Sequence, residues 1–183
     1  MQYRELGGDG LKMSALGLST LSWGEQNTGA EAHAQMDAAL DAGINLVDTA
    51  EMYPVPSRAE THGFSERYIG SWLRSTRGRQ DVVFATKVVS PARRGKANLR
   101  YMRDGRVSFT RAILFEGVDS SLQRLQTDYA DLLRRHHWPD RSTTVLQSIF
   151  GNMASIRCTA RCHSSPTDRS LRARSQAHLP CRG

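Results

Sequence analysis

The stretch Ile44-Asn-Leu-Val-Asp-Thr-Ala-Glu-Met-Tyr-Pro54 says most about the fold and chemistry of this chain. It places an acid, Asp48, at the end of a short apolar strand and a phenol, Tyr53, on the loop that follows. A tyrosine phenol in water has a pKa of roughly 10, so it becomes a useful proton donor only when positive charge and hydrogen bonds lower that value. The next predicted strand ends at Lys87, and His137 precedes a Trp-Pro pair further on. These four residues predict a proton-relay site at the ends of strands.

Seven short motifs follow one another along the first 142 residues. They are Tyr3-Arg-Glu-Leu-Gly7, Gly10-Leu-Lys-Met-Ser-Ala-Leu-Gly-Leu18, Thr20-Leu-Ser-Trp-Gly24, Asp48-Thr-Ala-Glu-Met-Tyr53, Ala85-Thr-Lys87, Ser121-Leu-Gln-Arg-Leu-Gln-Thr-Asp-Tyr129 and His137-Trp-Pro-Asp140. In this order they resemble the aldo-keto reductase family. The resemblance covers about residues 1–142.

The resemblance implies a fold and a reaction. The fold is α/β, a (β/α)8 TIM barrel, of which this chain would hold the N-terminal hairpin and about four βα units. The reaction is the NADP(H)-dependent reduction of a small-molecule aldehyde or ketone to an alcohol. By resemblance, Tyr53 is the general acid, Lys87 and Asp48 form a charge pair that lowers the Tyr53 pKa, and His137 orients the carbonyl. The residues that bind the cofactor stay unknown, because most of them would lie beyond the fourth strand.

Apolar and turn residues alternate along the chain in a pattern that supports the same fold. The predicted order is a hairpin around 7–10, strands over 14–21, 44–47, 82–85 (ending at Lys87) and from 129, and helices from a capping box at 28–31, from a cap at Ser65 and over 111–125. Strands that alternate with helices predict a parallel sheet, and polar residues at strand ends suit a TIM barrel. A doubly wound sheet would carry Gly-x-Gly-x-x-Gly after its first strand, and this sequence does not.

Composition divides the chain near Ser142. The net charge is +7, yet residues 1–142 hold 19 basic and 17 acidic side chains, whereas residues 143–183 hold six arginines and one acid. All three cysteines lie in that second segment. We therefore expect a partial barrel over 1–142 and a basic, Cys/Arg/Ser-rich tail over 143–183.

The start of the chain has no apolar core of a signal peptide and no apolar run approaches 18 residues, which predicts a cytoplasmic protein without a membrane span.

The tail allows several interpretations. Its Cys and His residues have irregular spacing, so we expect no metal site, and its basic character without a recognition motif argues against specific nucleic-acid binding. An arginine-rich segment without βα pattern is also what a shifted reading frame in a GC-rich gene produces, so the chain is expected to be truncated. Two alternatives to the enzyme follow: a non-catalytic half-barrel scaffold and a nucleic-acid-associated basic protein. A half-barrel leaves open strand edges, which predicts low stability or self-association.

The fourth predicted strand is one residue longer than the family pattern. It reads Asp131-Leu-Leu-Arg-Arg-His-His-Trp-Pro139, and one inserted residue reverses the faces of all later side chains. Either a bulge absorbs the insertion or the strand is not properly formed. His137 matches the family histidine by its Trp-Pro neighbour, and His136 matches it by its distance from Asp131. We favour His137. The two adjacent arginines place at least one guanidinium in an interior setting, which is unfavourable without a partner.

Overall fold

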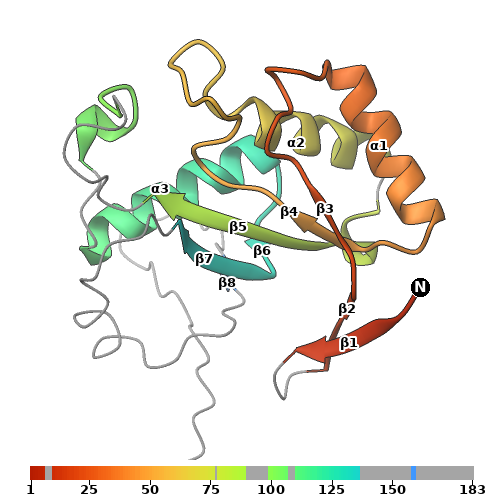
Figure 1. Cartoon of the computed structure of the whole chain (residues 1–183). Helices are drawn as coiled ribbons and strands as arrows, with labels where there is room; N and C mark the ends of the chain where they lie inside the picture. The colour runs from red at the N-terminus through yellow and green to blue at the C-terminus, as the bar shows by residue number, and fades with distance from the viewer. Residues whose placement is uncertain (7–9, 77, 90–98, 107–109, 137–157, 160–183) are drawn as a thin grey trace, which may run out of the picture.

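The computed structural model describes residues 1–6, 10–76, 78–89, 99–106, 110–136 and 158–159 (Figure 1). Its centre is a parallel sheet with the strand order β3-β4-β5-β7. These strands are β3 (Gly17–Ser19), β4 (Leu46–Asp48), β5 (Val83–Val89) and β7 (Leu132–His136). An antiparallel hairpin precedes the sheet, formed by β1 (Tyr3–Leu6) and β2 (Leu11–Ser14). A second short pair joins β6 (Tyr129–Ala130) to β8 (Cys158–Thr159).

Three helices lie along one side of this sheet (Figure 1). They are α1 (Gly29–Asp41), α2 (Phe64–Thr76) and α3 (Arg111–Leu125), with short 3-10 turns η1 (Arg79–Asp81) and η2 (Arg103–Gly105) between them. Helix α1 begins with the expected capping box, in which Glu31 N–H donates to Thr28 Oγ1 and Thr28 N–H donates to the Glu31 carboxylate. The chain leaves α1 through Gly43 at φ +78°, a conformation that favours glycine.

Strand alternation gives the sheet two different faces. Val47 and Phe84 point toward the helices and pack with α1 and α2 around Trp23 and Trp72. Val83, Ala85 and Leu132 point the other way. There they pack against partly buried side chains of the hairpin and of β4, namely Leu6, Leu11, Met13 and Leu46. The hairpin therefore covers the inner face of the sheet, the face turned away from the helices, around Val83, Ala85 and Leu132.

The structure confirms most predicted elements and corrects two. The hairpin, α1 and α3 form where the sequence predicts them. Ser65 does not cap α2: it lies inside the helix, and its buried hydroxyl donates to the carbonyl oxygens of Thr20 and Trp23. The strand at Val83 runs to Val89, so Lys87 lies within β5 and not at its end.

The fourth strand of the sheet is regular over its described length. β7 pairs with β5 through five consecutive positions, from Ala85↔Leu132 to Val89↔His136, without a bulge between them. The fold class is confirmed as the TIM-barrel type, seen in the described residues as an open parallel sheet with helices on one face. Apart from 158–159, the predicted tail over 143–183 lies outside the described residues. No helix in the described ranges is long and apolar enough to cross a membrane.

Candidate active site

Polar side chains replace apolar ones on the inner face of the sheet as the strands approach their carboxyl ends. Asp48 is the last residue of β4, and Lys87 lies within β5, two residues beyond Ala85. Arg134 of β7 is the register partner of Lys87. Because alternate residues of a strand share a face, Lys87 and Arg134 continue the rows that begin at Ala85 and Leu132. The inner face of the sheet is thus apolar where the hairpin covers it and charged at its carboxyl edge. We call Asp48, Lys87 and Arg134 at this edge the charged patch.

Lys87 connects the predicted residues with one another. Its Nζ donates to Asp48 Oδ2 at 2.6 Å, to the Thr49 carbonyl oxygen at 2.9 Å and to Tyr53 Oη at 3.2 Å. The same ammonium lies 4.7 Å from the centroid of the Tyr53 ring. Only 9% of the Lys87 surface is exposed. Three of the four residues in the predicted set, Asp48, Tyr53 and Lys87, therefore form one contiguous cluster.

The loop after β4 positions Tyr53 because it stays hydrogen-bonded to β5. Thr49 N–H donates to the Ala85 carbonyl at 2.8 Å, and Glu51 N–H donates to the Lys87 carbonyl at 3.0 Å. In return, Val89 N–H donates to the Glu51 carboxylate, which also forms a buried ion pair with Arg103. The loop is thus fixed to β5 along its length, and its buried Tyr53 ring is held beside Lys87.

A histidine lies against Tyr53, and it is His136. The two rings meet edge to face with their centroids 5.5 Å apart. His136 is the last residue of β7 and shares the inner face with Arg134, because two positions separate them. Burial, with the nearby charges of Lys87 and Arg134, lowers the pKa of His136 to about 4, so this imidazole is neutral near neutral pH. His137, the histidine favoured from the sequence, lies outside the described residues.

Arg134 also belongs to this cluster, although the sequence predicted only that one of the two adjacent arginines would lie in an unfavourable interior setting. Its Nη2 donates to Asp48 Oδ1, while Lys87 binds the other oxygen of the same carboxylate. Half of the Arg134 side chain is exposed. The signal that could have found it was the strand period: Arg134 lies two residues before His136 and must share its face. The guanidinium on this inner face is half exposed, and a carboxylate pairs with it.

Burial and hydrogen bonding act in opposite directions on Lys87. Desolvation is the larger effect and lowers the pKa of Lys87, whereas its hydrogen bond to the Tyr53 hydroxyl raises it. Burial also lowers the pKa of Arg134. Within the described residues, no group of three or more His, Cys, Asp or Glu side chains is placed to hold a metal ion.

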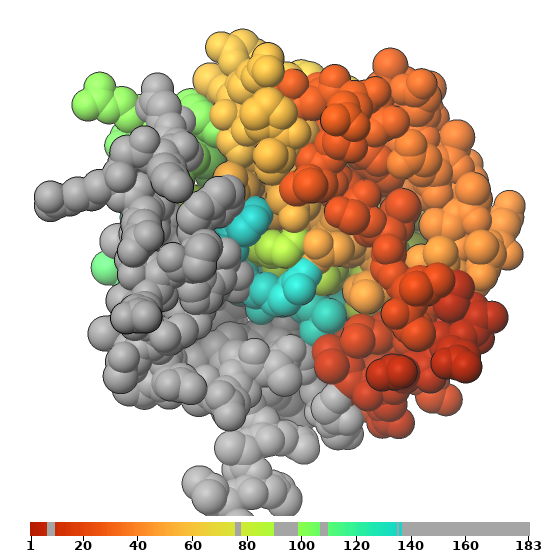
Figure 2. All heavy atoms as spheres, in the orientation of Figure 1, coloured from red at the N-terminus to blue at the C-terminus, as the bar shows by residue number. Residues whose placement is uncertain are grey.

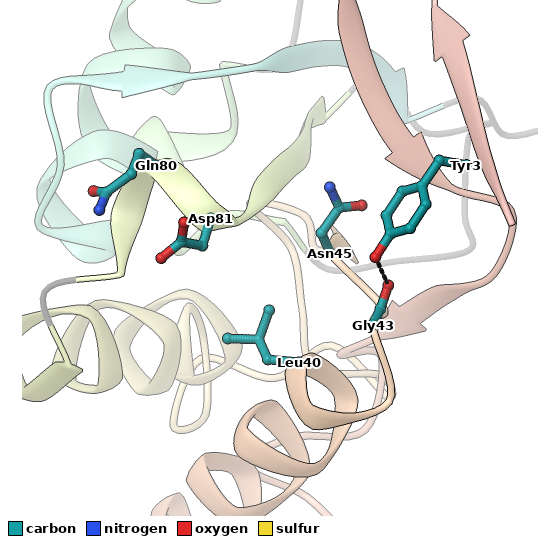
Figure 3. Close-up of a pocket in the computed structure, with 6 residues that line it drawn as sticks. All are labelled: Tyr3, Leu40, Gly43, Asn45, Gln80 and Asp81. Atoms are coloured by element: carbon teal, nitrogen blue, oxygen red, sulfur yellow. Dashed lines mark hydrogen bonds between the residues drawn. The ribbon is translucent and has the colours of Figure 1, made fainter. Parts of the chain in front are cut away.

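A separate hollow of about 470 Å³ lies near the amino ends of the strands (Figure 3). Its lining includes Asn45, which precedes β4, and Asp81, which precedes β5. Tyr3 closes one side, where its hydroxyl donates to the Gly43 carbonyl at 2.8 Å. Tyr53, Lys87 and Asp48 are not among the lining residues, so this hollow is distinct from the charged patch.

This chain is similar to known proteins in sequence and in fold. A sequence model described as "Aldo/keto reductase family" matches residues 15–160, which is most of the chain. This chain belongs to the aldo-keto reductase family. The match extends beyond residue 142, where the motifs read from the sequence ended. The family is one of oxidoreductases that typically use reduced nicotinamide dinucleotides.

Individual relatives agree with this assignment. The chain is 46% identical to Protein tas of Escherichia coli over 153 residues, which are 84% of this chain and 42% of that protein. It is 37% identical over 138 residues to the uncharacterized oxidoreductase YrpG of Bacillus subtilis, covering 75% of this chain and 40% of that one. The chain therefore spans less than half the length of these curated relatives.

Solved structures show the same partial match. A putative aldo-keto reductase from Pseudomonas aeruginosa superposes with a TM-score of 0.59 at 30% identity, covering 81% of this chain and 50% of that one. The holo form of an aldo-keto reductase from Bacillus halodurans superposes with a TM-score of 0.55 at 35% identity, covering 73% and 39%.

Proposed function

We propose that this chain acts in the NADP(H)-dependent reduction of an aldehyde or ketone to an alcohol, with Tyr53 as the general acid. The observation that carries the proposal is the position of Lys87 Nζ, which contacts both Tyr53 Oη and Asp48 Oδ2. Because Lys87 donates to the Tyr53 oxygen, the phenolic hydrogen stays available for a substrate. A cation beside a phenol stabilises the phenolate that forms when the proton leaves.

The chain's own residues supply the protonation half of the reaction. Tyr53 donates its proton to the carbonyl oxygen, and Lys87 stabilises the resulting phenolate while Asp48 holds Lys87 in place. A bound reduced nicotinamide supplies the hydride for the carbonyl carbon, and the product is the alcohol. The neutral ring of His136 offers an N–H that can hydrogen-bond the carbonyl oxygen and orient it.

The described residues fit the reactive end of such a cofactor. Asp48, Tyr53 and Lys87 make a polar floor at the carboxyl edge of a parallel sheet, where TIM-barrel enzymes place their chemistry. Asp48 and Lys87 would border the nicotinamide, and we assign no described residue to the phosphates or the adenosine. NADP is proposed over NAD, and the cytoplasm as the location, on family resemblance.

Isotope transfer tests this function directly. The 183-residue chain is incubated with NADPH or NADH deuterated at the transferable position and a panel of small aldehydes and ketones. We expect deuterium at the carbinol carbon of the product, with NADPH the better donor. Catalytic turnover with NADH but not NADPH would overturn the NADP assignment. No deuterium transfer from either cofactor would favour the non-catalytic scaffold.

The two adjacent histidines give a matched pair of variants. We propose His136 as the orienting group because its ring contacts Tyr53, and His137 remains the alternative from the sequence. His136→Gln is expected to lower kcat/KM by roughly 10-fold or more, since it removes a hydrogen bond made to the reacting carbonyl. His137→Gln is expected to change it by less than about threefold, well below the effect of losing such a bond. The reverse order of effects would return the role to His137.

We further propose that copies of the chain self-associate through the open edges of the sheet. In the described residues, β3 pairs only with β4, and β7 pairs only with β5, so each outer strand has an unpaired side. Unpaired strand edges are templates for pairing with another chain. Light scattering on a sizing column is expected to show a mass above one chain that increases with concentration. A monomeric mass together with a sharp, reversible thermal transition would contradict the proposal.

A further inference from the structure

The site holds more positive charge than proton donation requires. Lys87 donates to the Tyr53 hydroxyl oxygen, and Arg134 binds the second oxygen of Asp48. In their usual charge states, these two cations and one carboxylate leave a net charge of +1. The nearby buried carboxylates each have a cation of their own, since Glu51 pairs with Arg103 and Glu66 pairs with Arg124. The cluster is therefore suited to an anion.

Arg134 is placed to meet that anion. Its register partner is Lys87, so the two side chains lie side by side on neighbouring strands of the inner face. Half of the Arg134 side chain is exposed, and atoms of β5 and β7 reach the surface between the hairpin and the loop after β4 (Figure 2). A guanidinium has five N–H donors in a planar fork. Its bond to Asp48 therefore leaves further donors that can face a ligand.

We propose that Arg134 binds the carboxylate of an anionic carbonyl substrate, so that the site prefers 2-oxo acids over neutral aldehydes and ketones. In a 2-oxo acid the carboxylate is bonded directly to the carbonyl carbon. The carbonyl oxygen can then face Tyr53 while the carboxylate faces Arg134, because both side chains are linked through Asp48 and Lys87. Arginine matches a carboxylate with two parallel hydrogen bonds, which adds geometric selection to the charge.

This substrate class rests on the proposed function, but its binding step can be measured without cofactor or turnover. The probe is pyruvate, and acetone is its neutral counterpart. Ligand-observed NMR titration of the 183-residue chain is expected to show saturable pyruvate binding that weakens as salt is added. Acetone is expected to bind much more weakly.

Three variants distinguish specific binding of pyruvate by the Arg134 guanidinium from a general effect of positive charge. Arg134→Gln is expected to weaken pyruvate binding roughly 10- to 100-fold, the usual effect of losing a charge-assisted hydrogen bond. Arg134→Lys keeps the charge without the fork and is expected to restore part of the loss. The control is Arg106→Gln, which removes another half-exposed arginine that is paired with a carboxylate, Glu116, and it should bind pyruvate as the parent chain does. Circular dichroism confirms that each variant is folded.

Several outcomes would overturn the inference. These are equal affinity for pyruvate and acetone, no pyruvate binding at all, or unchanged binding in Arg134→Gln. Displacement of pyruvate by inorganic phosphate at lower concentration would also overturn it, because the site would then suit a phosphate group better. If pyruvate binding depends on Arg134 but no deuterium is transferred, the anion site is supported and the reductase function is rejected. If deuterium is transferred to neutral aldehydes only, the reductase function is supported and the anion site is rejected.

Discussion

Tyr53→Phe is expected to lower kcat/KM for carbonyl reduction by roughly 100- to 10,000-fold, the usual contribution of a positioned general acid. The substitution removes only the hydroxyl that Lys87 contacts at 3.2 Å and keeps the buried ring against His136. The loss should therefore be catalytic and leave the fold unchanged. Steady-state rates of NADPH oxidation, measured beside a urea unfolding curve, separate the two effects.

Tyr3→Phe is the matched control for this change. It also removes a phenolic hydroxyl that makes a hydrogen bond, but that bond goes to Gly43 in the hollow near the amino ends of the strands. We expect no more than a small change in kcat/KM. Lys87→Met should lower kcat/KM about as much as Tyr53→Phe does. The double variant should lower kcat/KM little further, because the effects of residues that act as one unit are not additive. Parent-like activity in Tyr53→Phe would reject Tyr53 as the acid.

Arg124→Leu is expected to lower the free energy of unfolding by about 3–5 kcal/mol, the effect of leaving one partner of a buried ion pair uncompensated. Arg124 Nε donates to Glu66 Oε2 at 2.7 Å, and the Glu66 side chain is fully buried. The other oxygen of Glu66 accepts from Thr86 of β5 at 2.8 Å. The pair therefore joins α2 and α3 to the sheet beneath the site. Urea titration followed by circular dichroism measures the loss.

Arg106→Leu tests whether burial causes this effect. Its ion pair with Glu116 is nearly as short, 2.8 Å against 2.7 Å, but both side chains are about half exposed. Exposed pairs contribute less than about 1 kcal/mol, so this variant should unfold near the parent midpoint. If the Arg124→Leu variant is already unfolded without urea, this result also agrees with a large loss in the free energy of unfolding. Equal midpoints for the two leucine variants would show that the Glu66 pair is not an important part of the core.

Local signals in the sequence predicted the elements that depend on near neighbours. The capping box at Thr28 and Glu31 formed as expected, because its partners lie within one helical turn. The helix over 111–125 formed because its apolar spacing is regular along the chain. Ser65 was misassigned as a cap, because its hydroxyl found the Thr20 and Trp23 carbonyls more than 40 residues away. Such a long-range partner leaves no mark in the residues around Ser65.

The same distinction applies to the site. The types and order of Asp48, Tyr53 and Lys87 predicted a site at the strand ends, and the structure brings these three side chains into contact. The role of Arg134 could not be read in this way, because pairing with Asp48 depends on which strands become neighbours. The five regular pairs of β7 with β5 place His136 beside Tyr53, whereas His137, the histidine favoured from the sequence, stays a prediction outside the described residues.

For this protein, the order of its motifs was enough to show a resemblance to the family, and residue identity and local spacing predicted the alternation of strands and helices and a cluster of acid, phenol and cation. The register of the parallel sheet established the rest: Lys87 within β5, Arg134 beside it, and one carboxylate shared by two cations. The reason is physical. Local patterns report which face of an element is apolar, whereas a contact between strands that are about 40 residues apart exists only after the sheet has formed.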